Sequence, residues 1–312
     1  ARVAVESFGG FAMSSTGPKA GGRDYLDTFL AGHAESSLRA GAGGAVDSRE
    51  YKVDIYIVDG PPARAPEWRL SGEDAPAAEA LAQAIWLVSG LVALVGRADA
   101  GATSAQSTSA QSTSAQSTSA QSTAALLALE AALPGLARVR SEPEITHRIP
   151  GQDTHERRDL ARGPTLILAD RARPGPTGLA HLVAAIAAGC PTLVVAPPEA
   201  QSGWLTVLAC VRAAGIDATR CDVVPARDAT EAAAWIGVPS VATVVIDGPR
   251  TPWSAALGAA LGDRRRPVAL PHVWCALDGP DLQDGPALLL RHLLVRTVAV
   301  NTMRHGAPLS LD

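Results

Sequence analysis

Two apolar runs on either side of an alanine-rich segment decide the fold of this chain. Residues 165–169 read TLILA, residues 178–189 read GLAHLVAAIAAG, and residues 191–196 read PTLVVA. Short, wholly apolar runs rich in Val, Ile and Leu are typical of strands buried on both faces, and such strands belong to parallel sheets. The alanine-rich segment ends at a glycine, as a crossover helix does. The pattern therefore predicts a β-α-β unit.

The same alternation continues toward the C-terminus. Strands are predicted at residues 221–225, 240–246 and 267–270, and helices at residues 202–214, 230–236 and 253–261. Buried strands that alternate with helices indicate a doubly wound parallel sheet with helices on both faces. We therefore expect the α/β class, with a Rossmann-like domain over residues 148–296.

The preceding region, residues 31–147, is predicted to hold a strand, two helices and a linker. Residues 51–58 (YKVDIYIV) have the pattern of a strand, and helices are expected from an N-cap at Ser71 to Arg97 and from Ala124 to Leu136. Between the helices, the sequence SAQST occurs four times, over residues 104–123. Small polar residues bury too little surface to offset the entropy of ordering, so we expect a flexible linker or a surface loop.

Composition argues against several kinds of partner. The 312 residues include 27 basic and 31 acidic ones, and the net charge of −4 gives no electrostatic basis for binding nucleic acid or anionic lipid. The longest apolar stretch, from Ala80 to Val95, is interrupted by Gln83, Ser89 and Gly90, which favours a buried or oligomer-facing helix over a membrane span.

The cysteines and the first residues give expectations about location. The four cysteines form no CxxC pair, so we expect reduced thiols in a cytoplasmic protein and no metal site. The N-terminus lacks the charged and apolar regions of a signal peptide. Since the chain begins with Ala, we expect it to start inside a longer gene product.

Few residues are candidates for chemistry. Asp170 and Asp247 follow predicted strands at the carboxyl edge of the sheet, where such folds bind ligands, although we favour ordinary turn formation for both. Cys190 and Cys275 are interpreted as structural thiols and not as nucleophiles. The seven histidines form no HExxH motif, and no GxGxxG motif occurs.

The first thirty residues carry a family resemblance. Residues 6–26 read ESFGGFAMSSTGPKAGGRDYL, which closely resembles the end of the catalytic domain in L-glutamate-γ-semialdehyde (1-pyrroline-5-carboxylate) dehydrogenases, where the pattern is roughly PFGGFKMSGTGPKAGGPDYL. Ser7 and Ser15 depart from the usual Pro and Gly. The resemblance implies that residues 1–30 contain the aldehyde anchor loop. There, the backbone N–H groups of Gly21 and Gly22 would bind the substrate carboxylate, and Phe29 would pack on its methylenes.

Three later segments extend this resemblance. Residues 148–158 (RIPGQDTHERR) resemble the LPGPTGERN segment of long-form proline utilization A, and residues 182–195 (LVAAIAAGCPTLVV) resemble an aldehyde dehydrogenase helix and strand. Residues 298–311 (VAVNTMRHGAPLSL) resemble the closing segment of proline utilization A. The resemblance implies a catalytic-domain remnant at 1–30, a connecting region at 31–147, a Rossmann-like domain at 148–296 and a closing motif at 297–312.

The resemblance implies a part of an enzyme. The whole enzyme would oxidise L-glutamate γ-semialdehyde to L-glutamate with NAD in proline catabolism, and would hold FAD if a proline dehydrogenase domain precedes. The catalytic Cys and Glu are expected upstream, so no catalytic, cofactor-binding or metal residue is assigned here. Residues 196–199 (APPE) and 247–251 (DGPRT) replace the family's KPSE and GSTxxG, which predicts a non-catalytic domain that covers the active site.

Other functions remain open from the sequence. The expected partners are an upstream dehydrogenase domain and further copies in a homo-oligomer. One alternative is a stand-alone interaction module that binds a dehydrogenase subunit in trans. Another is an independent NAD-binding enzyme that uses the Rossmann-like half.

Overall fold

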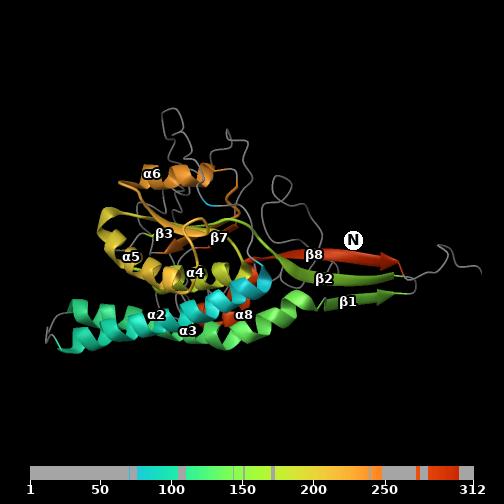
Figure 1. Ribbon diagram of the computed structural model, residues 1–312, viewed down its shortest axis with the longest axis horizontal. Helices are drawn as coiled ribbons and strands as arrows, with labels where there is room; N and C mark the ends of the chain where they lie inside the picture. The colour runs from blue at the N-terminus through green and yellow to red at the C-terminus, as the bar shows by residue number, and fades with distance from the viewer. Residues whose placement is uncertain are drawn as a thin grey trace, which may run out of the picture.

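A five-stranded parallel sheet lies at the centre of the described part of the chain (Figure 1). The computed structural model describes residues 70, 76–104, 110–142, 144–149, 152–169, 173–238, 240–247, 272–274 and 280–301. The parallel strands are β3 (Thr165–Ala169), β4 (Thr192–Ala196), β5 (Cys221–Pro225), β6 (Thr243–Asp247) and β7 (His272–Trp274). Their order is β5-β4-β3-β6-β7, with every neighbouring pair parallel. This is the Rossmann order, and the predicted α/β class is confirmed.

Successive side chains of the sheet enter two separate cores. Ile167 of β3 belongs to the core beneath α4 (Pro176–Ala188) and α5 (Pro198–Ala213). Leu166 and Leu168 belong to the core on the opposite face, with Trp235 of the short helical segment formed by α6 (Ala229–Ala234) and η2 (Trp235–Gly237). Figure 1 shows α6 and α4 on opposite sides of the sheet. The sheet is therefore doubly wound, as predicted.

The predicted boundaries from β3 to β6 lie within a few residues of those in the structure. The strand expected at 240–246 lies at Thr243–Asp247. The helix and strand expected at 253–261 and 267–270 lie outside the described residues, as does the strand expected at 51–58. Strand β7, at His272–Trp274, was not predicted.

The SAQST repeat differs from the expectation of a linker or loop. Helix α2 covers Ala77–Ser104 and helix α3 covers Ala110–Ser141, so the repeat from Ala110 onward is helical. Within it, the buried Ser122 donates a hydrogen bond from Oγ to the Thr118 carbonyl at 2.9 Å. The apolar second half of α3 packs in the core, which favours continued helix through the Ala and Gln residues before it. The expected N-cap, Ser71, lies outside the described residues, and α2 begins after Pro76.

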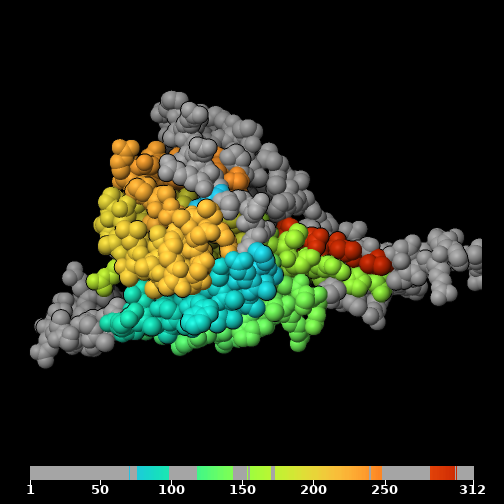
Figure 2. Space-filling model, in the orientation of Figure 1, coloured from blue at the N-terminus to red at the C-terminus, as the bar shows by residue number. Residues whose placement is uncertain are grey.

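Helices α2 and α3 form an outer layer against α4. Their buried residues, among them Leu87, Leu91, Leu126 and Leu129, share one core with most of α4. Figure 2 shows the two helices as a continuous band along one side of the molecule. Residues 77–97 and 118–141 are long and apolar enough to cross a membrane by length and composition alone, with 28% and 33% of these windows buried, which is weak evidence. Their packing on α4 agrees with the predicted buried-helix interpretation.

A second sheet of three antiparallel strands extends from one end of the molecule (Figure 1). It consists of β1 (Glu144–Ile149), β2 (Gln152–Ala161) and β8 (Leu293–Asn301), in the order β1-β2-β8. A 3-10 turn, η3 (Pro280–Gln283), and a short helix, α8 (Gly285–Arg291), lead into β8. The register pairs Gln152 with Asn301 and His155 with Val298. Two segments that resemble proline utilization A, about 140 residues apart in sequence, are therefore neighbouring strands.

Candidate functional site

The predicted anchor-loop residues lie outside the described part of the chain. This applies to Gly21, Gly22 and Phe29, and also to Asp170 and Cys275. Their assignment stays a prediction from the family resemblance. The described residues instead show two buried polar attachments on helix α4, one at its N-terminus and one along its length.

The first attachment joins Asp247 to the start of α4. Asp247 is the last residue of β6, is 1% exposed, and pairs in register with Ala169 at the end of β3. Its carboxylate accepts hydrogen bonds from the backbone N–H of Gly175 at 2.7 Å and of Gly178 at 2.9 Å, one on each oxygen. Gly175 is the N-cap of α4, Pro176 has no N–H, and the first turn of α4 carries no acidic residue. The carboxylate therefore supplies the negative charge that the helix N-terminus favours.

The two glycines are required by how closely the carboxylate approaches. A Cβ on Gly178 would lie 2.6 Å from Asp247 Oδ2, and a Cβ on Gly175 would overlap the same carboxylate. Sequence analysis predicted Asp247 as a turn former, and this was wrong: its side chain reaches across the sheet edge to a helix. The sequence held two features that could have indicated this contact: an Asp directly after an apolar strand, and the GPTG segment at the start of a predicted helix.

The described residues do not fit a dinucleotide. In a Rossmann-like fold, a pyrophosphate lies at the N-terminus of the helix that follows the first strand. Here that helix is α4, and the Asp247 carboxylate already accepts hydrogen bonds from two of the N–H groups at its start, those of Gly175 and Gly178. At the end of β4, the chain turns into α5 through Ala196, Pro197 and Pro198, without the lysine of the family pattern. That this domain is a non-catalytic copy stays a prediction.

The second attachment is a pair of buried histidines. His181 of α4 and His292, which joins α8 to β8, are fully buried, and His181 Nδ1 lies 2.9 Å from His292 Nε2. His292 Nδ1 lies 3.5 Å from the Thr165 hydroxyl, and the Cys190 thiol donates to the His292 carbonyl at 3.4 Å. Burial lowers the pKa of His181 to about 3, and the nearby charge of Arg291 acts in the same direction.

The pair is neutral at physiological pH. Burial lowers the pKa of His292 well below its ordinary value, and the charges of His181, Arg162 and Arg291 add to this effect. One neutral ring can donate to the other, so a single proton between them satisfies the contact. Arg162 donates from Nε to the Arg291 carbonyl at 2.8 Å and from Nη2 to the Leu293 carbonyl at 3.0 Å. These contacts hold the start of β8 against the Rossmann-like domain.

The described cysteines have the environment of structural thiols. Cys190 and Cys221 are buried, and burial raises the pKa of the Cys221 thiol to about 12. A nucleophilic cysteine needs a lowered pKa and access to substrate. Cys190 is therefore structural, as interpreted from the sequence. Within the described ranges, no group of three or more His, Cys, Asp or Glu side chains is placed to hold a metal ion.

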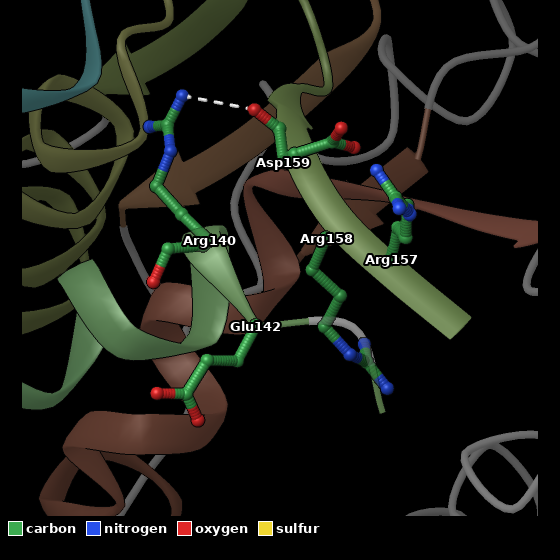
Figure 3. A pocket seen from close by; sticks show the side chains of 6 residues that line it. Arg140, Glu142, Arg157, Arg158 and Asp159 are labelled. Atoms are coloured by element: carbon green, nitrogen blue, oxygen red, sulfur yellow. Dashed lines mark hydrogen bonds between the residues drawn. The ribbon is translucent and has the colours of Figure 1, made fainter. Parts of the chain in front are cut away.

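A shallow polar hollow lies where α3 meets β2 (Figure 3). Arg140 donates from Nη1 to the Ala188 carbonyl at 2.9 Å and from Nη2 to the Asp159 carbonyl at 3.2 Å. Its guanidinium thereby joins the end of α4 to the antiparallel sheet. Figure 3 shows Arg157 and Arg158 on the neighbouring strand, directed away from the Arg140 guanidinium. These contacts fasten elements together and do not form a ligand site.

Comparisons with known proteins give structural similarity only. No protein-family model matches the chain, and no curated protein matches it. A mutant of proline utilization A from Bradyrhizobium japonicum is similar at 16% identity and a TM-score of 0.48, over 64% of this chain and 20% of that one. Proline utilization A from Bdellovibrio bacteriovorus is similar at 12% identity and a TM-score of 0.47, over 65% and 20%.

A third similar structure is that of a benzaldehyde dehydrogenase. An NAD-dependent benzaldehyde dehydrogenase from Corynebacterium glutamicum is similar at 16% identity and a TM-score of 0.47, over 65% of this chain and 42% of that one. The chain thus spans less than half the length of each of these three structures.

Proposed function

We propose that this chain is the C-terminal part of an NAD-dependent L-glutamate-γ-semialdehyde dehydrogenase of proline catabolism. In this proposal, residues 1–30 complete the substrate site of an upstream catalytic domain. The Rossmann-like domain binds no cofactor and serves in cover and assembly. NAD, bound by the upstream domain, accepts the hydride from the substrate.

One observation carries the proposal furthest, the pairing of β2 with β8. Both strands contain segments that resemble proline utilization A, and their register brings Asp153 opposite Val300 and Thr154 opposite Ala299. Two resemblances read independently from the sequence thus fall on adjacent strands of one sheet. That sheet extends from the body, which suits an element that reaches over a neighbouring domain (Figure 1). Covering a site excludes water and competing reactants.

The anchor loop would act on the substrate through its backbone. Glycine lets backbone N–H groups approach an anion closely, so Gly21 and Gly22 would hold the carboxylate of the semialdehyde. The ring of Phe29 would cover the methylene chain and hold the aldehyde carbon in place for the upstream nucleophile. The chain supplies orientation in this proposal, and the covalent chemistry belongs to the upstream segment.

The test is to follow NADH with L-glutamate γ-semialdehyde and NAD. We expect no turnover from the chain alone, and turnover when the upstream catalytic segment is joined to it or added in trans. Phe29→Ala in the active assembly should raise KM by roughly tenfold with a smaller change in kcat, and Phe29→Leu should restore part of the loss. NADH formation by the chain alone would overturn the proposal and direct attention to Cys275.

A further inference from the structure

The position of Asp247 in the sheet has a meaning beyond helix capping. The chain leaves β3 through α4 toward β4 and β5, and then returns to place β6 on the other side of β3. The carboxyl ends of β3 and β6 therefore flank the point at which the strand order reverses, where open α/β sheets bind ligands. Asp247 ends β6 at that point.

The carboxylate reproduces the contacts of a bound anion. Its two oxygens accept hydrogen bonds from two backbone N–H groups at the N-terminus of a 13-residue helix, Gly175 N–H on one oxygen and Gly178 N–H on the other. Glycines at both contact positions leave no Cβ in the way, which is what close backbone approach to a phosphate requires. The group is buried, so bulk water does not compete with these bonds.

We propose that Asp247 is an internal anion that closes the phosphate-binding end of this Rossmann-like domain, and that removing its carboxylate opens the site to inorganic phosphate. The disagreement between the fold and a dinucleotide then has a physical cause at the start of α4: two N–H donors that could bind a phosphate are already bonded to the protein's own carboxylate. Asp247 is thus the residue that determines which ligands this domain rejects. The inference does not depend on the proposed function.

Asp228, which also caps a helix, provides a matched control for Asp247. Asp228 accepts from the Glu231 N–H at 2.9 Å as the N-cap of α6, but this contact is exposed and lies away from the reversal point of the sheet. Asp228→Ala therefore removes a helix cap without removing a buried carboxylate from the end of a central strand.

The experiment is thermal unfolding of the full chain in sodium phosphate and in sodium chloride at equal ionic strength. We expect the same Tm for the unaltered protein in both salts. Asp247→Ala should lower Tm by roughly 5–10 °C in chloride, and phosphate should selectively recover at least about 2 °C of this loss. Asp228→Ala should lower Tm by less and should not respond to phosphate. Phosphate that stabilises the unaltered protein as much as Asp247→Ala, or that fails to stabilise Asp247→Ala, would overturn the proposal.

A second variant keeps the test decisive if Asp247→Ala does not fold in chloride. Asp247→Asn keeps the volume but places an amide N–H₂ against one of the two backbone donors. We expect a lowered Tm and no phosphate response, because the side chain still fills the position. A Tm equal to that of the unaltered protein would show that the negative charge is not required, and would overturn the inference. Refolding of Asp247→Ala only when phosphate is present would support it.

Discussion

The two sheets of this molecule are stabilised in different ways. Every residue of β3, β4 and β6 in the parallel sheet is buried, and these strands have helices on both faces. In the antiparallel sheet, Leu160 and Val300 are 42% and 43% exposed, and buried Glu156 and Arg158 lie 3.7 Å apart as an ion pair. The first sheet depends on apolar burial, while the second depends on strand pairing and on side chains that fasten it to the body.

This difference predicts unequal tolerance of substitution. Burial of an aliphatic side chain contributes about 1.5–3 kcal/mol, and truncation in a core also leaves a cavity. Exposed positions of a sheet lose little when truncated. The same substitution should therefore lower the free energy of unfolding much more in the parallel sheet than at an exposed position of the antiparallel sheet.

Leucine-to-alanine substitutions give the largest expected effect. Leu166 of β3 is fully buried in the core beside Trp235, whereas Leu160 of β2 is 42% exposed. We expect Leu166→Ala to lower the free energy of unfolding by about 2–5 kcal/mol and Leu160→Ala by less than about 1 kcal/mol. Urea denaturation with a common m-value measures both. Equal losses at the two positions would remove the distinction between the sheets.

The same difference explains which elements the sequence predicted. The parallel strands are uniform apolar runs, and β3, β4 and β5 were predicted almost to the residue. Strands β1 and β2 read EITHRI and QDTHERRDLA, and neither shows a regular alternation of apolar and polar residues. In β2, the buried positions include the charged residues Glu156 and Arg158. Since pattern analysis depends on apolar periodicity, a strand with a buried ion pair is not detected.

Long-range contacts account for the remaining differences. The SAQST residues were expected to be unstructured from composition, but α3 is continuous from Ala110 because its later turns pack on α2 and α4. The Asp247 contact joins residues 69 and 72 positions apart, and the histidine pair joins residues 111 apart. No local pattern encodes such pairs. The residues of the anchor loop stay predictions, since they lie outside the described residues.

The junction between the two sheets should be sensitive to acid. The folded-state pKa of His181 is lowered to about 3 and that of His292 is also lowered, so below the ordinary value of about 6.5 the unfolded chain binds more protons than the folded one. Stability is therefore full above about pH 6.5 and falls progressively as the pH decreases below that value, because the unfolded histidines take up protons that the folded pair does not. Arg162 and Arg291 face the pair and oppose its protonation.

Denaturant midpoints measured from pH 7.5 to pH 4.5 test this dependence. His181→Gln should reduce the slope by removing one titrating group, at a cost in stability at neutral pH. A free energy of unfolding that stays constant from pH 6.5 to 4.5 would contradict the neutral buried pair.

A smaller effect is expected at the start of α8. Gly285 of α8 lies against α3, and a Cβ there would come within 2.7 Å of the Ala128 carbonyl carbon and 3.0 Å of Ala132 Cβ. We expect Gly285→Ala to lower the free energy of unfolding by about 1–3 kcal/mol, because backbone must move. Gly96→Ala in α2 is the control, since nothing lies within 4 Å of a Cβ there, and it should be neutral or stabilising by up to about 1 kcal/mol. A neutral Gly285→Ala would show that α8 shifts freely.

The smallest effect belongs to the ion pair between β2 and β8. Arg296 donates hydrogen bonds from its guanidinium to the Asp159 carboxylate, at side-chain exposures of 40% and 29%. Burial acts to raise the pKa of Asp159, but the hydrogen bonds to its carboxylate and the charges of Arg296 and Arg157 together outweigh burial, and the pKa lies below its ordinary value. The stabilisation is therefore present above about pH 3.9 and is lost as the pH falls through the lower folded value.

Solvent screening keeps the stabilisation by this ion pair small, so Asp159→Asn should cost about 0–1 kcal/mol, and less in high salt. Glu142→Gln, in the more exposed Arg138–Glu142 pair, is the control and should cost nothing measurable. A loss above about 2 kcal/mol for Asp159→Asn would mean that this pair, and not strand pairing, holds β8 in place.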